Sequence, residues 1–358
     1  MKKQTRLQQK MEIRMKNLIK LSVAALTLSM AANVASADGK LSIYHWFEYI
    51  PQELLDKFSA EHDVEVTMDT FDSNEAMLAS LKAGKIGTYD VAVPGDYMVE
   101  IMAGDGMLDT FAKSELPNHG NIMDQWVNVG FDMGRKSSIP YQWGSTSFSV
   151  NRDDYKGDIN TLAIVFDPPT ELQGKINVLD SQGELLALAS MYLGIPQCTS
   201  DRDQLKALNE LLQNAKPHWA SFGSDIAKDV LVSGDASVGM IWSGFGAKAR
   251  EEGANIEYAF PKEGYVVWMD NVVLLKDAPN RDNALKFMNF LLEPENAAAV
   301  TNYAAYTAGV KGTEPHLSDA VANSPESNPP ASPVGEFVQA CSQEVQTVYD
   351  TIWTNLKK

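Results

Sequence analysis

Two spacings of apolar residues alternate along the first part of the chain. The segments at 40–46 (KLSIYHW) and 64–71 (VEVTMDTF) are predicted strands, the second because apolar side chains recur at every other position. The segment between them, 51–63 (PQELLDKFSAEHD), is a predicted helix, since its leucines and phenylalanine share one face and proline suits its first turn. The order strand, helix, strand is typical of an α/β protein.

The same alternation continues further along the chain. Asp72 and Glu75 have the spacing of a capping box, which predicts a helix from there to Gly84. A buried strand at 89–95 (YDVAVPG) and a short helix at 96–106 follow. Repeated units of this kind build an open sheet that is covered by helices.

A second group of elements follows a long extended segment at 139–151 (IPYQWGSTSFSVN). The apolar strand at 266–275 (VVWMDNVVLL) is predicted to return to the first group. The other predicted elements are strands at 175–180, 218–223 and 238–242 and helices at 183–194, 202–215, 225–233, 280–292 and 344–358.

The length of the chain predicts two lobes, because one ordinary core does not grow to this size. We expect residues 38–145 and 268–310 to form lobe one. Residues 146–267 and 311–358 are expected to form lobe two. Each lobe is predicted to be an open sheet flanked by helices.

The N-terminus has the three parts of a secretion signal. Seven basic residues lie within positions 2–20, an apolar run follows at 21–35, and small residues predict cleavage after Ala37. The apolar run is short for a bilayer span, so secretion is preferred to the alternative of a membrane anchor. No cysteine stands at the cleavage point to carry a lipid, and Met11 or Met15 is an alternative start.

The secreted part is strongly acidic. The chain has 30 basic and 47 acidic residues, and removal of the 7 basic and 1 acidic residue of the leader leaves 23 against 46, a charge of −23. A chain with this charge repels nucleic acid and anionic membranes, and it attracts cations. Solubility alone is an alternative reason for the charge.

The cysteines and histidines form no catalytic or metal-binding motif. Cys198 and Cys341 are the two cysteines, and in a secreted protein they are a candidate disulfide if the C-terminal tail packs on lobe two. No CxxC, zinc-type spacing, GxSxG, HExxH or Walker loop occurs, and the five histidines are scattered. The sequence therefore favours a binding protein without a cofactor over an enzyme.

Aromatic residues and carboxylates recur where predicted strands end, which is the edge at which open α/β sheets bind ligands. Trp268 and Asp270 lie two apart on the returning strand and therefore on one face. The other candidates are Trp46, Phe47, Glu48 and Tyr49 after the first strand, Asp96 and Tyr97, Asp180 and Glu184, Trp242, and Tyr306.

A cleft with these side chains suits an organic cation. Aromatic faces attract ammonium groups by about 0.5 to 2 kcal/mol each and also cover the methylenes between charges. Buried carboxylates need partners, and the cleft motifs contain no basic residue that could neutralise Glu48, Glu184 or Asp270. For each residue alone, packing or helix-dipole stabilisation is the alternative, so the prediction depends on their joint occurrence.

Seven segments form an ordered set: YHWFEYIP, FDSNEAM, YDVAVPGDY, IPYQWG, VGMIWSG, FPKEG and VVWMDNVVLL. This set resembles the bacterial spermidine/putrescine periplasmic binding proteins over nearly all of the chain after the leader. The resemblance implies the two-lobed type II periplasmic binding protein fold and a periplasmic location. It also implies a polyamine ligand and delivery to an ABC importer, with a membrane permease and a cytoplasmic ATPase as partners. We expect a monomer that binds no nucleic acid and does not insert into the membrane.

The resemblance assigns roles to individual residues. Glu48 matches the acid that binds a terminal amine, Glu184 the acid that binds the far amine, and Asp270 the acid of an aromatic-x-Asp pair. The other matched positions are Trp46, Phe47, Tyr49, Tyr97, Trp242, Trp268, Tyr306 and, across a gap, Gln339.

Three positions depart from the family's pattern. Gly95 replaces a serine, Ser181 replaces an acid of the spermidine-binding members, and Phe245 stands where a putrescine-specific member has an acid. The three matched acids fit the three nitrogens of spermidine, but they could also hold putrescine. The polyamine therefore stays open, with spermidine preferred.

Three other binding functions stay open. The same fold can serve a sensor that docks on a membrane receptor, which the neighbouring genes would distinguish. A binding protein for another small amine is the second alternative, although an amino acid would want an arginine and none stands in the cleft motifs. Iron binding is the third, but Tyr303 and Tyr306 are three apart and not adjacent.

Overall fold

The computed structural model describes residues 39–327, 329–330, 332 and 335–358. The predicted secretion signal and its cleavage after Ala37 lie outside the described residues. Among those that are described, no helix combines the length and the apolar character that a membrane span requires.

One large mixed sheet runs through Gly39–Lys358, with the strand order β2-β1-β3-β11-β6-β9-β7-β8. The pairs β1–β2, β1–β3, β7–β8 and β7–β9 are parallel, whereas β11 pairs antiparallel with both β3 and β6. These strands are β1 (Gly39–Trp46), β2 (Val64–Phe71), β3 (Val91–Ala92), β6 (Ser138–Asn151), β7 (Ile176–Val178), β8 (Trp219–Phe222), β9 (Val238–Trp242) and β11 (Val266–Leu274).

Short strands complete the sheet at its margins. They are β10 (Ile256–Tyr258) and β12 (Thr307–Ala308), which pair with β6, and β13 (Glu336–Phe337), which pairs with β11. A separate hairpin joins β4 (Asn128–Val129) to β5 (Asp132–Met133).

Helices alternate with these strands, as the apolar spacing predicts. The mixed α/β class is therefore confirmed. The helices are α2 (Gln52–His62), α3 (Asn74–Ser80), α4 (Asp96–Gly104), α5 (Asp124–Val127), α6 (Ala163–Phe166), α7 (Gln182–Leu193), α8 (Arg202–Ala215), α9 (Ala227–Ser233), α10 (Ser243–Glu251), α11 (Arg281–Leu291), α12 (Pro294–Ala304), α13 (Asp319–Ala322) and α14 (Gln343–Leu356).

One predicted helix start is wrong. Ser73 and not Asp72 is the N-cap of α3, because the Ser73 hydroxyl accepts a hydrogen bond from the Ala76 backbone N–H at 3.2 Å. Glu75 closes no capping box at this end, and its carboxylate instead accepts a hydrogen bond from the Tyr97 hydroxyl at 2.8 Å.

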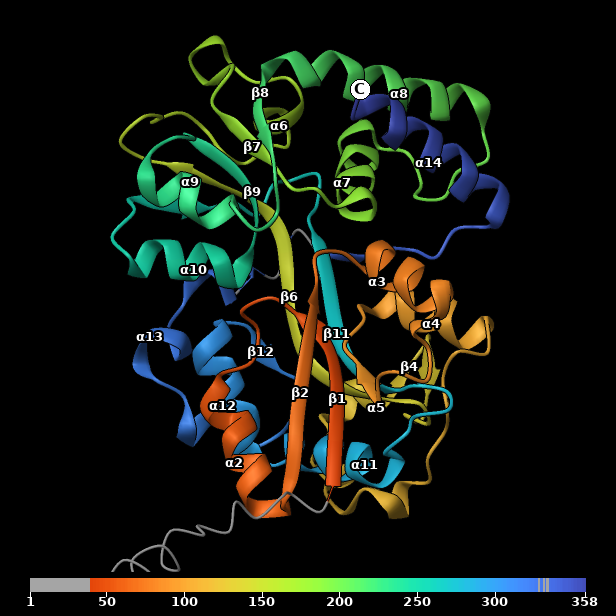
Figure 1. The fold of residues 1–358 in the computed structure, drawn as a ribbon. Coiled ribbons are helices and arrows are strands. Elements are labelled where there is room, and N and C mark those ends of the chain that lie inside the picture. Colours follow the sequence, from red (N-terminus) through yellow and green to blue (C-terminus); the bar gives the residue numbers. More distant parts are fainter. Residues whose placement is uncertain (1–38, 328, 331, 333–334) are drawn as a thin grey trace, which may run out of the picture. The chain divides into compact units, whose positions relative to one another are not determined.

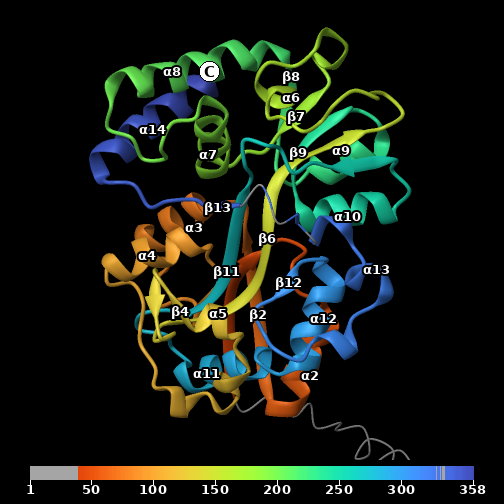
Figure 2. The same cartoon turned by 180° about the vertical axis from the view of Figure 1, so that it is seen from behind.

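In the described part of the chain, buried apolar residues form three larger clusters, two of which together are called the first core. The first core consists of buried residues at 41–141 and 272–310, between the sheet and helices such as α2, α11 and α4. The second core consists of buried residues at 148–266 and 345–356, around α7, α8 and α14. The long strands β6 and β11 pair with each other and run from one group of helices to the other (Figures 1 and 2). The predicted lobe boundaries at 145/146 and 267/268 fall in these two strands, the third lies at 310/311, and all three stay a prediction.

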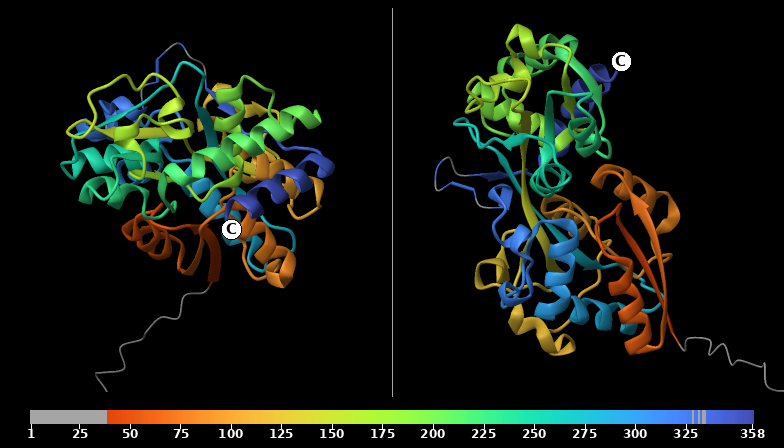
Figure 3. Two further views of the ribbon diagram at one scale, coloured as in Figure 1. Left: turned by 90° about the horizontal axis from the view of Figure 1, so that it is seen from above. Right: turned by 90° about the vertical axis from the view of Figure 1, so that its left-hand side faces the viewer.

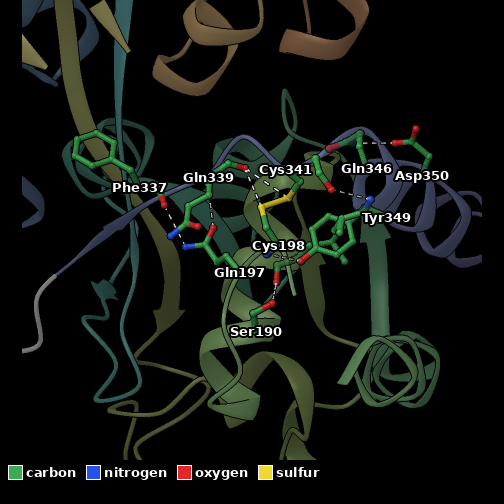
Figure 4. The surroundings of a disulfide bond; sticks show 12 residues. Ser190, Gln197, Cys198, Phe337, Gln339, Cys341, Gln346, Tyr349 and Asp350 are labelled. Atoms are coloured by element: carbon green, nitrogen blue, oxygen red, sulfur yellow. Dashed lines mark hydrogen bonds between the residues drawn. A yellow bond between two sulfur atoms is a disulfide. The ribbon is translucent and has the colours of Figure 1, made fainter. Parts of the chain in front are cut away.

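The C-terminal tail joins the second core through a disulfide. The bond links Cys198 to Cys341, which confirms the predicted pair, and it spans a sequence separation of 143 residues. Around it, the Cys198 backbone N–H donates to the Tyr349 hydroxyl at 3.1 Å (Figure 4). Gln197 donates to the Phe337 carbonyl at 3.1 Å. Beyond the disulfide, α14 packs on α7 and α8 (blue and green in Figure 3).

Candidate functional site

A cavity of about 580 Å³ takes its lining from both cores, and its size is typical of a small-molecule site. Side chains from the ends of β1 and β9 and from within β11 contribute, as does the first turn of α7. Nine of the eleven predicted ligand-binding residues line it: Trp46, Phe47, Tyr49, Tyr97, Glu184, Trp242, Trp268, Asp270 and Tyr306.

Glu48 is not among the residues that line the cavity. It lies in the turn that follows β1, with a φ of 48° and an exposed side chain. Its charge acts on Lys248 and Tyr303 outside the cavity. The left-handed turn rotates Glu48 away from its neighbours Phe47 and Tyr49, which do line the cavity.

Gln339 also lies outside, and Val338 lines the cavity in its place. Gln339 is exposed, and its backbone N–H donates to the Gln197 side-chain oxygen at 3.3 Å. It lines a smaller neighbouring pocket together with Val338 and Tyr97. A shift of one position along the tail therefore decides whether a side chain lines the larger cavity.

Glu184 is held by two other side chains. It is buried in the first turn of α7, and its carboxylate accepts a hydrogen bond from the Thr146 hydroxyl of β6. The Trp242 indole N–H donates to both carboxylate oxygens, at 3.0 and 3.2 Å. The Trp268 indole N–H donates to the Thr146 hydroxyl at 3.0 Å. These contacts fix the planes of two tryptophan rings relative to one carboxylate.

Thr146 was missed by the sequence analysis. It is fully buried on β6, and it is the polar contact through which Trp268 of β11 is joined to Glu184 of α7. The alternating polar residues of the segment at 139–151 could have indicated an inward-facing hydroxyl, but not its partner.

Asp270 stands at an irregularity of β11. The register of β11 on β6 shifts between Met269 and Asn271, so Asp270 has no partner in that ladder, and it forms an isolated bridge with Gly95 instead. Burial raises the pKa of the Asp270 carboxyl well above its usual range, a shift that the hydroxyl of Tyr49 opposes. Asp270 and Trp268 both line the cavity, as the sequence predicts.

Asp96 supports the neighbouring backbone. Its carboxylate accepts hydrogen bonds from the backbone N–H groups of Met269 and Tyr97, each at 2.7 Å. Burial raises the pKa of Asp96 to about 7, against these hydrogen bonds. Asp96 thereby fixes β11 one residue before Asp270.

Glu75 is a further acid of the lining, which also contains Asp72, Asp180 and Asp225, and the sequence pattern predicted only a capping role for it. Burial raises the pKa of its carboxyl, and the hydrogen bond from the Tyr97 hydroxyl opposes this shift. The signal that could have found it is its position in the first turn of the helix after β2, at the same sheet edge as Trp46.

Aromatic rings surround the acids on several sides. Trp46 lies 4.6 Å from the Phe71 ring and 6.4 Å from the Trp242 ring, so it contacts residues of both cores. The Trp268 and Tyr306 rings meet edge to face at 4.9 Å between centroids. Such faces and edges are suited to the methylenes and ammonium groups of a cationic chain.

The charges of the lining are all of one sign. The lining contains acids and no lysine or arginine, and within the described part of the chain no group of three metal-ligating side chains occurs. Burial is the main cause that raises the pKa of Glu184, as it is for Asp270. A ligand with several ammonium groups would supply the missing positive charge, since buried carboxylates are costly without a partner.

Comparisons with known proteins agree with this geometry. Residues 53–329 match the family model described as bacterial extracellular solute-binding protein. The chain is 35% identical over 341 residues to the spermidine/putrescine-binding periplasmic protein of Salmonella typhimurium, with 94% of this chain and 97% of that protein covered. It is 35% identical to the putrescine-binding periplasmic protein SpuD of Pseudomonas aeruginosa, covering 85% and 88%.

A solved structure is similar over the same range. It is described as a putative spermidine/putrescine ABC transporter from Listeria monocytogenes, with a TM-score of 0.83 and 30% sequence identity. The alignment covers 89% of this chain and 98% of that structure. The predicted solute-binding protein fold is confirmed by this similarity.

Proposed function

This chain belongs to the bacterial extracellular solute-binding proteins, and we propose that it captures a polyamine and hands it to an ABC importer. The family consists of binding proteins and not of enzymes. The observation that carries the proposal is the cavity itself, in which Trp242 and Trp268 are oriented around Glu184 and Asp270 without any lining lysine or arginine.

Each lining group has a place in this proposal. Glu184 and Asp270 each bind an ammonium group, and the rings of Trp242 and Trp268 cover the methylenes between them. Glu75 takes the third position that the sequence analysis gave to Glu48. Three acids then match the three amines of spermidine, which is the ligand we propose, with putrescine engaging two.

Export of the chain to the periplasm is also part of the proposal. Its support is the basic and apolar N-terminus, which predicts export and cleavage after Ala37, and the similarity to periplasmic proteins. In the periplasm, the loaded protein docks as a monomer on the permease subunits, and a cytoplasmic ATPase drives import.

Calorimetric titration of the secreted part, residues 38–358, tests the ligand. We expect saturable binding of one spermidine per chain, weaker binding of putrescine, and no binding of glutamate or arginine. Glutamate is excluded because its carboxylates meet the acidic lining, and arginine because its carboxylate would stand among acids. A chain that binds an amino acid and no polyamine would contradict the proposed function.

Binding is expected to strengthen as the pH rises through the raised pKa values of the cavity carboxyl groups. In the ligand-free protein, burial raises the pKa of Asp270 and Glu184 and raises that of Asp96 to about 7. A bound ammonium favours the ionised carboxylates and lowers these pKa values, so binding releases protons between the free and bound pKa values. The affinity then rises up to about tenfold per pH unit for each proton released.

Calorimetry in buffers of different ionisation enthalpy measures this proton release. We expect a positive proton release that diminishes as the pH rises above the raised pKa values of these carboxyl groups. A pH-independent affinity with no buffer dependence would show that the cavity carboxyl groups do not titrate on binding.

Ligand is expected to draw the two cores together by bending near Ser145–Ser149 and Tyr265–Val267. The support for two lobes, residues 38–145 with 268–310 and residues 146–267 with 311–358, is that the cavity lining comes from both cores and that β6 and β11 link them. A ligand that contacts both sides favours the state in which they are close. Small-angle scattering should show a smaller radius of gyration with spermidine, and an identical curve at saturation would contradict closure.

A further inference from the structure

The last helix places an ammonium group at the rim of the cavity. Lys357 follows α14, and its Nζ lies 2.7 Å from the Asp180 carboxylate. The same Nζ lies 5.0 Å from the centroid of the Phe222 ring and 5.5 Å from that of the Trp353 ring. One carboxylate and two aromatic rings therefore surround this ammonium.

The three surrounding residues all belong to the cavity lining. Asp180, Phe222 and Trp353 line the same cavity as Glu184 and Asp270. Their two rings meet edge to face, with 84° between the planes and 6.3 Å between centroids. They come from three separate parts of the chain: the segment before α7, the end of β8, and α14. The rim thus repeats the combination of acid and aromatic faces that the interior uses.

The contact between Lys357 and this rim is exchangeable. The side chains of Lys357 and Asp180 keep 35% and 48% of their exposure, and a pair as exposed as this is weakened by solvent and contributes little to stability. A ligand ammonium of the same chemistry can therefore replace Lys357 at Asp180.

We propose that Asp180, Phe222 and Trp353 form an outer ammonium subsite, which Lys357 fills in this structure and which a terminal amine of a longer polyamine takes by displacing Lys357. This inference rests on the proposed function, because it extends the same cavity. The chemical class that the outer subsite recognises is a primary ammonium at the end of an alkyl chain. We expect putrescine, held by the interior acids, to be too short to reach it and the tetra-amine spermine to be long enough. Lys357 therefore restrains the binding of long polyamines.

Replacement of Lys357 by alanine tests the subsite. Calorimetric titration should show spermine binding about three- to tenfold tighter for Lys357→Ala than for the unmodified protein, with putrescine affinity changed by less than about twofold. Lys358→Ala is the matched control, since Lys358 is the adjacent exposed lysine and bonds only Asn355 among the contacts of its ammonium that the structure shows. It removes the same charge and is expected to change neither affinity.

A second variant tests whether the gain in spermine affinity depends on Asp180. In Asp180→Asn the outer subsite loses its carboxylate, so spermine should bind about three- to tenfold more weakly while putrescine is unaffected. In the double variant the gain from Lys357→Ala should disappear. Melting temperatures recorded on the same samples identify any variant that has lost its fold, and only folded variants are compared.

The outcomes separate the two proposals. If Lys357→Ala and Lys358→Ala strengthen putrescine and spermine alike, the effect is one of net charge, and the outer subsite is overturned. If neither ligand responds to either variant or to Asp180→Asn, the outer subsite is also overturned, while polyamine binding stands. If the unmodified protein binds no polyamine, spermidine included, the proposed function fails first and the subsite with it.

Discussion

Replacing Asp270 with asparagine is expected to weaken spermidine binding by about 30-fold to several thousand-fold, the equivalent of about 2 to 5 kcal/mol. The substitution keeps the shape of the side chain and removes its charge. Asp270 is buried at the irregularity of β11, and burial raises the pKa of its carboxyl, so its ionised form lacks compensation until a cation binds. The loss should therefore appear in affinity and not in stability.

The melting temperature of the ligand-free Asp270→Asn protein is expected to stay the same or rise. The reason is the sign of the pKa shift, since a carboxyl whose folded pKa is raised destabilises the folded state once the pH exceeds its unfolded pKa. If Asp270 served the fold alone, the variant would melt earlier and bind spermidine as before.

Glu48→Gln is the matched control for Asp270→Asn. It removes the same charge from an exposed residue in the turn after β1, outside the cavity lining. We expect its spermidine affinity to change by less than about threefold, because an exposed charge acts on the ligand only through solvent. Equal losses for the two variants would show that net charge, and not the buried carboxylate, sets the affinity.

Removal of the disulfide is expected to lower the free energy of unfolding by about 2 to 5 kcal/mol. Cys198 and Cys341 close a long loop, with a sequence separation of 143 residues, and the chain-entropy model assigns the larger effects to longer loops. The double variant Cys198→Ser/Cys341→Ser should therefore unfold at a clearly lower urea concentration than the oxidised protein.

The same double variant also tests whether the C-terminal tail contributes to spermidine binding. Val338 lines the cavity just before Cys341, and α14 carries Trp353 to the rim, so a loosened tail should also weaken spermidine binding. The control is the unmodified protein unfolded with and without reductant, which should show the same difference in midpoint. If the double variant, the reduced protein and the oxidised protein all unfold at the same urea concentration, the disulfide adds nothing to stability.

Local spacing was sufficient for most elements near the site. The period-two pattern of β2 and the one-sided apolar face of α2 are properties of neighbouring residues, so the sequence shows them directly. The pairing of Trp268 with Asp270 was also predicted, because both lie on one strand. Although β11 is irregular at this point, both side chains still line the cavity.

Positions after a strand end were harder to predict. Glu48 and Glu75 are both acids close to the carboxyl ends of strands, and only backbone geometry separates them. The left-handed φ of Glu48 turns it outward, whereas α3 directs Glu75 to Tyr97. In the tail, a difference of one position decides between Val338 and Gln339. The spacing of residues in the sequence does not predict the directions in which these side chains point.

Contacts between residues far apart in the sequence could not be predicted from the spacing of apolar and polar residues. Thr146 meets Trp268 at a separation of 122 positions, and Lys357 meets Asp180 at a separation of 177. Each contact depends on how the two cores and the tail pack, which is settled by the whole fold. The acid–aromatic chemistry of the cavity was therefore predictable, while the hydrogen bonds that orient it were not.

A crystal structure of residues 38–358 grown with spermidine tests most directly whether this cavity is the polyamine site. We predict elongated density that runs through the cavity, with ammonium groups within hydrogen-bond distance of Glu184 and Asp270 and methylenes against the rings of Trp242 and Trp268. Well-ordered protein with spermidine bound elsewhere, and with Glu184 and Asp270 contacting only other protein groups, would contradict it.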